Sequence, residues 1–266
     1  MPLARVNGID INFERAGSGP RLLFINGSGA TLAQTRPLVD YYAARFDVVA
    51  YDQRGLGATS APAGPYTMAD YAADALALTE SIGWDRFRLL GVSFGGMVAQ
   101  EVAVTAPERI ERLALMCTSP GGEGGGSYPL HTLESLAPED QSEIWTQILD
   151  TRFTPEWLAS HPSDRMLAEM VAQRPMMPKP DEVRRGEVLQ LEARAHHDVH
   201  DRLPRITCPT LVASGRFDGI APLDNGRAIA AQIRGAELRI YEGGHVFFIQ
   251  DERAYPEVLE FLAQTG

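Results

Sequence analysis

Short apolar runs recur along the chain at intervals that leave room for a helix between most consecutive runs. They fall at residues 3–6, 9–14, 21–25, 46–51, 87–92, 113–117, 210–214 and 238–241. Runs of this length and composition are typical of strands buried on both faces of a parallel sheet. Residues 68–82, between two of them, carry their apolar side chains on one helical face. The pattern predicts an α/β fold, with a mostly parallel twisted sheet and helices on both faces.

The dipeptide Asn7-Gly8 separates the first two apolar runs. Asparagine and glycine tolerate the positive φ angles that a two-residue hairpin turn requires. We therefore expect the chain to open with a β-hairpin that forms the antiparallel edge of the sheet.

The alternation of strand and helix patterns stops between residues 120 and 201. The glycine-rich segment 121–126 leads there into helical patterns at 139–149, 155–160, 164–174 and 181–195, which prolines divide into short pieces. Glycine runs form flexible joints. We interpret residues 120–201 as a helical cap, or lid, inserted into a core made of residues 1–119 and 202–266.

Composition and charge restrict the class of partner. The chain has 266 residues, 44% of them hydrophobic, and a formal net charge of -11. A surface of this charge does not attract nucleic acid or an anionic membrane, so we expect a small-molecule substrate. No apolar stretch approaches the roughly 18 residues of a membrane span, and the N-terminus has no apolar leader. We expect a cytoplasmic protein, and leave open whether it forms a homo-oligomer.

The pentapeptide Gly91-Val92-Ser93-Phe94-Gly95 carries the clearest chemical signal. It follows a predicted strand and opens a helical stretch, which is the arrangement of a nucleophile elbow. Ser93 would then lie in a strained turn with its hydroxyl at the end of the sheet. Side chains at Gly91 or Gly95 would collide with the neighbouring strand or helix. The alternative is an ordinary turn with a helix-capping serine.

A serine hydroxyl is a poor nucleophile at neutral pH, so a neighbouring base must accept its proton, and an acidic side chain must orient that base. Asp218 follows the strand 210–214 directly, and His245 lies in a glycine-flanked loop after the last strand. Both positions fall on the edge of the sheet where Ser93 is expected, in the order serine, acid, histidine. The alternatives are a turn aspartate and a surface histidine. Three further acids are less favourably placed: Asp224, Glu242 and Asp251.

An oxyanion formed at Ser93 requires fixed hydrogen-bond donors. We expect one from the backbone N–H of Phe94 and the other from the glycine-rich loop after the strand 21–25, where we choose the N–H of Ser28. Asn26 and Gly27 in that loop, and Trp145 from the cap, are the residues that we expect to contact the substrate.

Taken together, these motifs resemble the α/β-hydrolase superfamily over essentially the whole chain. The segment 51–60 is similar to the D-x-R-G-x-G-x-S turn of this family, with Thr59 in the usual serine position and Ser60 one place late. In the family that turn is structural. Most members have His-Gly before the oxyanion position, whereas this chain has Asn26-Gly27.

Asparagine at that place, with residues 64–67, resembles the 3-oxoadipate enol-lactonase-like hydrolases. The resemblance implies a serine hydrolase that cleaves a small carboxylic ester or lactone through Ser93, His245 and Asp218, without metal or organic cofactor. The same arrangement also occurs in cofactor-free haloperoxidase-like esterases and in carbon–carbon bond hydrolases. A non-catalytic ligand receptor on the same fold is the more distant alternative.

Several other features have two readings. His196 and His200 have the i, i+4 spacing of a helical metal pair, but no third ligand is evident, so we expect no metal.

Arg54 and Glu101 fit structural ion pairs or charges at the rim. Cys117 and Cys208 stand in apolar settings and are expected to be buried thiols. Bulky apolar residues of the cap fit a substrate lining and helix packing equally well: Trp145, Phe153, Trp157, Met166, Met170, Met176 and Met177.

Overall fold

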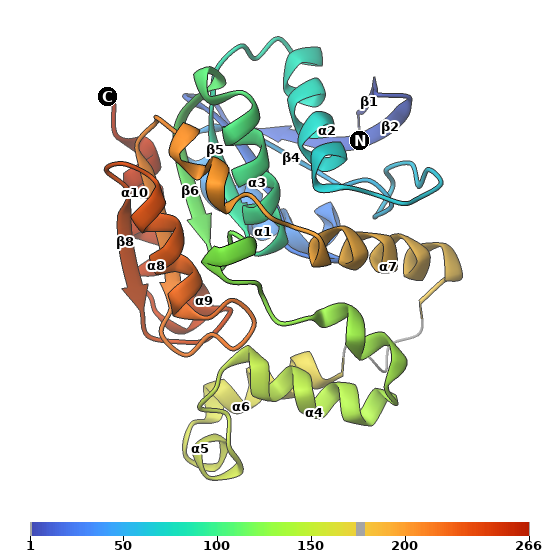
Figure 1. Ribbon diagram of the computed structural model, residues 1–266, viewed down its shortest axis with the longest axis vertical. Helices are drawn as coiled ribbons and strands as arrows, with labels where there is room; N and C mark the ends of the chain where they lie inside the picture. The colour runs from blue at the N-terminus through green and yellow to red at the C-terminus, as the bar shows by residue number, and fades with distance from the viewer. Residues whose placement is uncertain (1, 174–178, 266) are drawn as a thin grey trace.

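A single eight-stranded sheet forms the centre of the computed structural model, which describes residues 2–173 and 179–265 (Figure 1). The strands are Leu3–Val6 (β1), Ile9–Ala16 (β2), Arg21–Ile25 (β3), Asp47–Tyr51 (β4), Phe87–Val92 (β5), Ile110–Met116 (β6), Thr210–Gly215 (β7) and Glu237–Tyr241 (β8). Their order is β1-β2-β4-β3-β5-β6-β7-β8. Strands β3 to β8 pair in parallel, whereas β2 is antiparallel to both of its neighbours. The predicted α/β architecture is confirmed.

The antiparallel edge begins with the hairpin of β1 and β2. Asn7 and Gly8 form its turn with φ angles of 49° and 78°. Val6 pairs with Ile9, so the two residues between them make the whole turn. The predicted opening hairpin is therefore confirmed, and β2 joins it to the rest of the sheet through β4.

Consecutive residues of the central strands are buried on opposite faces of the sheet. In β3, Leu22 and Phe24 join one apolar core, and Leu23 and Ile25 join the other. Helices Leu32–Ala43 (α1), Phe247–Gln250 (α9) and Ala254–Ala263 (α10) cover the first core. Helices Met68–Ser81 (α2), Phe94–Thr105 (α3) and Leu223–Gln232 (α8) cover the second, and the short helix Pro107–Arg109 (η1) follows α3. This double burial explains the short apolar runs of the sequence.

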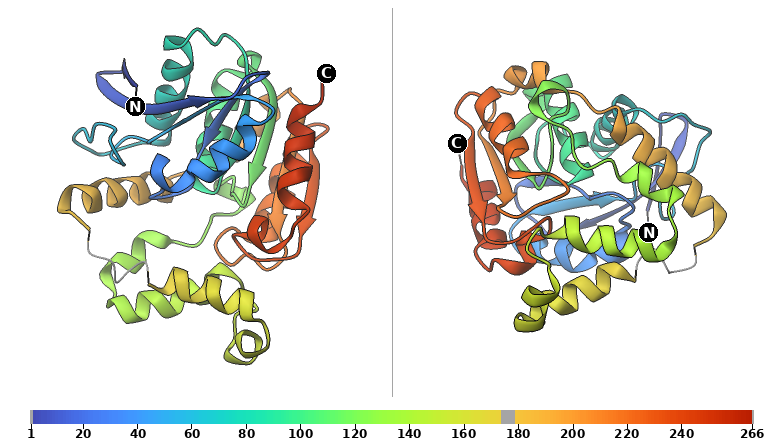
Figure 2. Two further views of the ribbon diagram at one scale, coloured as in Figure 1. Left: turned by 180° about the vertical axis from the view of Figure 1, so that it is seen from behind. Right: turned by 60° about the horizontal axis from the view of Figure 1, so that its bottom comes forward.

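The cap lies between β6 and β7. Its described elements are Gly122–Gly124 (η2), Leu130–Ser135 (η3), Pro138–Leu149 (α4), Pro155–Ser160 (α5), Pro162–Ala172 (α6) and Asp181–Ala195 (α7). His200–Arg205 (η5) crosses the expected boundary at residue 201 and leads back into the core. Helices α4, α5 and α6 form a group beyond the end of the sheet, whereas α7 runs beside the core (Figures 1 and 2). Proline at the first position of α4, α5 and α6 fits the start of a helix, where its missing N–H costs no hydrogen bond.

Helix α7 packs closely against loops of the core. A Cβ atom on Gly186 would lie 1.9 Å from the carbonyl oxygen of Gly55, so only glycine permits this approach. The Arg185 guanidinium donates a hydrogen bond to the carbonyl of Ala61 at 2.9 Å. These contacts fix α7 to the turn that follows β4.

The two connections between cap and core lie side by side. Gly121 pairs with Asp198 in an isolated β-bridge, and the Val199 N–H donates to the Pro120 carbonyl at 2.9 Å. A Cβ atom on Gly121 would lie 1.9 Å from the His197 carbonyl oxygen. The glycine-rich segment that we expected as a flexible joint therefore also allows close packing of these two connections.

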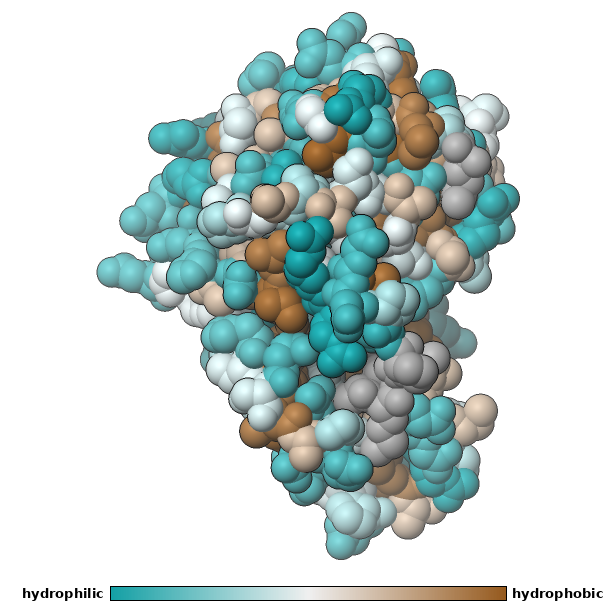
Figure 3. All heavy atoms as spheres, turned by 90° about the vertical axis from the view of Figure 1, so that its right-hand side faces the viewer, coloured by the Kyte–Doolittle hydropathy of each residue, from teal (hydrophilic) through white to brown (hydrophobic). Residues whose placement is uncertain are grey.

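The surface is mainly polar on the face shown in Figure 3, where apolar side chains gather only in small separate groups. In the part of the chain that the structure describes, no helix combines the length and hydropathy needed to cross a lipid bilayer.

Candidate active site

Ser93 lies in the turn between β5 and α3. Its φ and ψ angles are 55° and -117°, a strained conformation for a residue with a side chain. A Cβ atom on Gly91 would lie 2.4 Å from the Gly95 carbonyl oxygen, and one on Gly95 would lie 2.1 Å from that of Ile25. The sharp, strained turn and the steric need for both glycines are confirmed.

Two hydrogen bonds hold Ser93 in this conformation. Its backbone N–H donates to the Met116 carbonyl at 2.8 Å, and its own carbonyl accepts from the Thr118 hydroxyl at 2.8 Å. Met116 is the last residue of β6, the strand next to β5, and Thr118 follows two residues later. The neighbouring strand therefore helps to maintain the strained turn.

The side chains of Ser93, His245 and Asp218 form a continuous hydrogen-bonded chain. His245 Nε2 lies 2.9 Å from Ser93 Oγ, and its Nδ1 lies 2.9 Å from Asp218 Oδ2. Asp218 Oδ1 also accepts the backbone N–H groups of Ile220 and Ala221, each at 2.8 Å. His245 and Asp218 are 9% and 4% exposed. In this arrangement Asp218 can orient the imidazole, and the imidazole can accept the serine proton.

The three rival acids have other partners. Asp224 pairs with Arg227, Glu242 with Arg216, and Asp251 with Arg253. Asp251 supports the site indirectly, because its Oδ2 accepts the backbone N–H of Glu242 at 3.0 Å, close to the His245 loop. The Arg253 guanidinium is the main cause that lowers the pKa of Asp251 to about 2.

The two predicted oxyanion donors belong to segments on either side of Ser93. Phe94 is the first residue of α3, and the N–H groups of a first helical turn have no partner within the helix. Ser28 follows Gly27, where an added Cβ atom would lie 3.5 Å from Ser93 Cβ. Among the described residues, neither the Phe94 nor the Ser28 N–H has a hydrogen-bond acceptor. The role of these two N–H groups as oxyanion donors stays a prediction.

Side chains from the core and the cap fix the loop that carries Ser28. The Gln53 amide donates to the Asn26 carbonyl at 2.9 Å, and Gln190 of α7 accepts the Gly29 N–H at 2.8 Å. Asn26 Oδ1 accepts the N–H of Gly27 at 3.0 Å, whereas Asn26 Nδ2 is buried and has no hydrogen-bond partner among the residues that the structure describes. The expected contact of Asn26 and Gly27 with substrate stays a prediction.

The end of cap helix α4 contacts the loops of both His245 and Asp218. The His245 N–H donates to the Leu149 carbonyl at 2.6 Å, and the Gly219 N–H donates to the Ile148 carbonyl at 3.0 Å. Sequence reasoning missed these contacts, because no local pattern indicates which cap carbonyl meets a loop about 100 residues away.

Gln250 connects the His245 loop to two acidic residues of the cap. Its Oε1 accepts the Gly244 N–H at 2.9 Å, while its Nε2 donates to Asp150 at 2.9 Å and to Asp164 at 3.1 Å. Arg152 in turn pairs with Asp150 at 2.5 Å. The only sequence signal for Gln250 is its place five residues after His245 in a short helix.

A cavity of about 360 Å³ lies between the Ser28 loop and the cap. Ser28, Gly29 and Trp145 contribute to its lining, together with the Lys179–Glu187 ion pair of 2.8 Å. This volume suits a small organic molecule. Trp145 therefore lies on a cavity next to the predicted oxyanion loop, although Ser93 is not among the lining residues.

The other bulky apolar residues of the cap differ in how far they are buried. Phe153 is 5% exposed in a small core with Leu149, and Trp157 packs beside it and stacks on the His161 ring. Met166 and Met170 are 66% and 65% exposed on α6. Met176 and Met177 lie outside the described residues. Helix packing fits Phe153 and Trp157. Trp145 packs against two apolar clusters of the cap and also lines the cavity, so both interpretations fit it.

The His196 and His200 pair does not lie on one helix face. Helix α7 ends at Ala195, so the i, i+4 spacing has no helical meaning there, and His200 begins η5. Within the ranges that the structure describes, no group of three or more His, Cys, Asp or Glu side chains is placed to hold a metal.

Several polar residues outside the site form ion pairs or bind the backbone of the core. Arg54 pairs with Asp74 at 2.8 Å, and Glu101 pairs with Arg202 at 2.6 Å, so both form ion pairs. The turn after β4 is held by hydrogen bonds to the backbone. The Asp52 carboxylate accepts the Leu32 N–H at 2.7 Å. The hydroxyls of Thr59 and Ser60 accept N–H groups of β2 at 2.9 and 3.0 Å. Cys117 and Cys208 are buried free thiols, as expected.

Comparison with known proteins places this geometry in a family. The family model described as alpha/beta hydrolase fold matches residues 20–252. The chain belongs to this family. The membership in this family and the α/β-hydrolase fold that the sequence motifs implied are confirmed.

The relatives of this α/β hydrolase extend over almost its whole length. It is 27% identical over 256 residues to 3-oxoadipate enol-lactonase 2 of Acinetobacter baylyi, covering 95% of this chain and 92% of the relative. It is 25% identical over 264 residues to the putative carbamate hydrolase RutD of Azorhizobium caulinodans, covering 97% of each. The crystal structure of the enol-lactonase from Burkholderia xenovorans LB400 superposes with a TM-score of 0.81 at 25% identity, covering 99% of this chain and 100% of that one.

Proposed function

We propose that this α/β hydrolase cleaves a small carboxylic ester or lactone by two-step acyl transfer. The observation that carries the proposal is the hydrogen-bonded chain from Ser93 Oγ through His245 to Asp218, with distances of 2.9 Å at both links. Enol-lactones are the favoured substrate subclass, since two of the relatives described above are named enol-lactonases.

The first half of the reaction forms an acyl-enzyme. His245 Nε2 takes the proton of Ser93 Oγ while the oxygen attacks the substrate carbonyl. The N–H groups of Phe94 and Ser28 stabilise the negative charge that develops on the carbonyl oxygen. The His245 imidazolium then gives its proton to the leaving oxygen, and Asp218 stabilises the imidazolium throughout.

The second half regenerates the serine. Water enters at the place of the leaving group, His245 takes one of its protons, and the hydroxide attacks the acyl carbonyl. The tetrahedral species collapses to release the carboxylic acid, and the proton returns from His245 to Ser93 Oγ. For a lactone, acid and alcohol belong to one product, so ring opening leaves a single hydroxy or oxo acid.

The rivals use the same residues differently. A carbon–carbon bond hydrolase would cleave a diketone, and a haloperoxidase-like enzyme would form a peracid from a carboxylic acid and hydrogen peroxide. One relative is named as a putative carbamate hydrolase, so carbamates should also be tested as substrates. A non-catalytic receptor would bind such compounds without turnover.

A matched substrate panel tests the proposal. We expect kcat/KM for a simple γ-lactone, an enol-lactone and short nitrophenyl esters to exceed that for a carbamate and a β-diketone of similar size. The Ser93→Ala form serves as the background for each compound. Turnover of the diketone or the carbamate above that of every ester and lactone would reject the proposed bond class, and binding without turnover would favour the receptor.

A further inference from the structure

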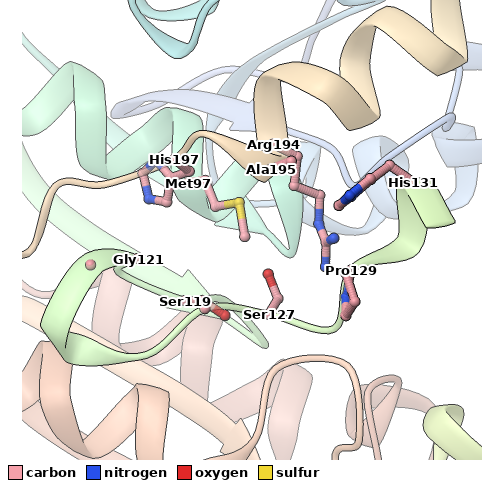
Figure 4. A pocket seen from close by; sticks show the side chains of 11 residues that line it. Met97, Ser119, Gly121, Ser127, Pro129, His131, Arg194, Ala195 and His197 are labelled. Atoms are coloured by element: carbon pink, nitrogen blue, oxygen red, sulfur yellow. The ribbon is translucent and has the colours of Figure 1, made fainter.

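A separate cavity of about 240 Å³ lies between α3, the end of β6 and the last turn of α7 (Figure 4). Its polar lining includes Ser119, Ser127, Arg194 and His197, and Met97 contributes an apolar wall. Figure 4 shows the Arg194 side chain descending toward Ser127, whose hydroxyl points into the space beside Met97. The proposed catalytic mechanism uses none of these side chains.

Arg194 carries a buried positive charge that the protein leaves largely uncompensated. Its side chain is 5% exposed, and one terminal nitrogen donates to the Tyr128 carbonyl at 2.7 Å. Arg194 Nε has no hydrogen-bond partner, and no carboxylate in the described part of the chain forms an ion pair with this guanidinium. Burial lowers the pKa of Arg194 to about 10, and the charge of Asp218 opposes this effect. The guanidinium therefore stays protonated at neutral pH.

His197 supplies further unused hydrogen-bonding groups on the same cavity. It is 7% exposed, and within the described ranges neither ring nitrogen has a hydrogen-bond partner of normal length and angle. Burial lowers the pKa of His197 to about 3, an effect that the nearby Ser119 backbone partly offsets and that Arg202 and Arg194 reinforce. The imidazole is therefore neutral near pH 7 and offers one donor and one acceptor.

Buried polar groups without partners are rare, because each has lost its hydrogen bonds to water. Here a guanidinium nitrogen without a partner in the described part of the chain and an imidazole whose one polar contact there is the Ser119 backbone line the same small cavity. A cation is disfavoured beside Arg194, whereas a carboxylate matches the planar fork of a guanidinium and accepts hydrogen bonds from hydroxyl and imidazole donors. The volume lies below the roughly 300 Å³ at which pockets for drug-sized ligands begin, and it suits a short acid.

We propose that this cavity is a binding site for a small organic carboxylate, held by Arg194 with Ser127 and His197 as additional hydrogen-bonding partners. The carboxylate has two possible sources: the substrate or product of Ser93, or a free acid that binds separately. The cavity stands close enough to Ser93 for the first source, because Met97 lies one helical turn after Ser93 and Ser119 directly follows Thr118, whose hydroxyl binds the Ser93 carbonyl. The binding claim itself does not rest on the proposed hydrolysis.

Calorimetric titration of the Ser93→Ala protein with propionate and with propionamide tests the site without turnover. We expect propionate to bind and the neutral amide of the same shape to bind at least about tenfold more weakly, since the amide lacks the charge that Arg194 recognises. Equal affinities for propionate and propionamide would overturn the proposal. So would propionate that binds no more strongly than chloride, which has a charge but no carboxylate. This comparison needs no variant at Arg194 and is independent of how that variant folds.

Variants then locate the site. Arg194→Met should weaken propionate binding by at least about tenfold, and Arg194→Lys should retain part of it, because lysine keeps the charge and loses the fork. Arg112→Met is the matched control: Arg112 is also buried, at 8% exposure, and donates to a backbone carbonyl, but it does not line this cavity. Unchanged binding in a folded Arg194→Met protein would show that propionate binds elsewhere, at Ser93 for example, and would refute the assignment.

Inhibition kinetics with a neutral nitrophenyl ester identify the source of the carboxylate. Competitive inhibition by propionate that Arg194→Met abolishes assigns the cavity to the acid group of the substrate or product. Non-competitive inhibition that the same variant abolishes assigns it to a separate free acid. Inhibition that persists in Arg194→Met contradicts the site in either form. If no ester is hydrolysed, the calorimetric result still decides the binding claim, so failure of the proposed function is distinguishable.

Discussion

The backbone N–H of His245 donates a 2.6 Å hydrogen bond to the carbonyl of Leu149, the last residue of cap helix α4. The proposed general base is thus attached to the cap as well as to the core. The adjacent Gly244 meets the cap equally closely, since a Cβ atom there would lie 2.0 Å from the same carbonyl oxygen. Changes at this junction should therefore alter catalysis without any contact to substrate.

Gln250 offers a direct test of that junction. Gln250→Ala removes the acceptor of the Gly244 N–H and both hydrogen bonds to the cap. A lost hydrogen bond of about 1 kcal/mol corresponds to a roughly fivefold to tenfold change in rate. We expect kcat to fall by about that factor with little change in KM. Steady-state kinetics with a nitrophenyl ester measure both.

The control for Gln250 is Gln232→Ala. Gln232 is the last residue of α8, away from the His245 loop, and the substitution removes its amide contact to His200 of η5. It should leave kcat unchanged. Equal kcat values for Gln250→Ala and wild type would mean that the backbone bond from His245 to Leu149 suffices to hold the loop.

Asp218→Asn tests the proposed orienting acid. The substitution keeps the size of the side chain but favours the wrong imidazole tautomer and removes the charge that stabilises the imidazolium. We expect kcat to fall by roughly 10³–10⁴. Asp224→Asn, at an exposed acid paired with Arg227, should leave the rate unchanged and thereby separates a local role from a general loss of charge.

The nucleophile elbow makes a prediction about stability. Gly95→Ala would place Cβ 2.1 Å from the Ile25 carbonyl oxygen, and overpacking against backbone costs about 2–3 kcal/mol of the free energy of unfolding. Gly126→Ala is the matched control, since a Cβ there meets nothing within 4 Å and no positive φ is involved. Urea unfolding measures both. A Gly95→Ala protein as stable as Gly126→Ala would contradict the tight turn.

His197 makes a prediction about pH. Its pKa is lowered from 6.5 to about 3 in the folded protein, so the folded state binds fewer protons than the unfolded state between these values. Stability that is fully present above pH 6.5 is therefore lost as the pH falls toward 3. His197→Gln cannot take up this proton, and its loss of stability between pH 7 and pH 4 should be smaller by roughly 3 kcal/mol. Parallel curves for the two proteins would show that the imidazole is solvated.

Local sequence patterns sufficed for much of the architecture and for the arrangement around Ser93. The strand, the turn and the helix around Ser93 are contiguous, so the two glycines and the apolar runs specify them together. Asp218 and His245 could be found because each directly follows a strand, and the ends of parallel strands meet at one edge of the sheet. Gly243 and Gly244, directly before His245, indicated that the histidine lies in a loop.

The rest depends on contacts between distant segments that leave no local trace. Gln190 meets Gly29 across 161 residues, and Gln250 meets Asp150 across 100. Arg194 looks like an ordinary charge near a helix end, and only the packing of α7 on the core buries it. The spacing of His196 and His200 was misleading for a similar reason. Helix α7 ends at Ala195, and this end depends on how the chain returns to the core, which no local pattern shows.

The central claim is that Ser93 is a nucleophile activated by His245. Treatment with a fluorophosphonate, followed by peptide mass spectrometry, tests it most directly, because this reagent phosphonylates a serine only when a neighbouring base activates it. We predict one adduct per chain, located on Ser93, absent from Ser93→Ala and slowed by at least about 10² in His245→Ala. An unlabelled wild-type protein, an adduct on another residue, or equal labelling of the His245→Ala form would contradict the account.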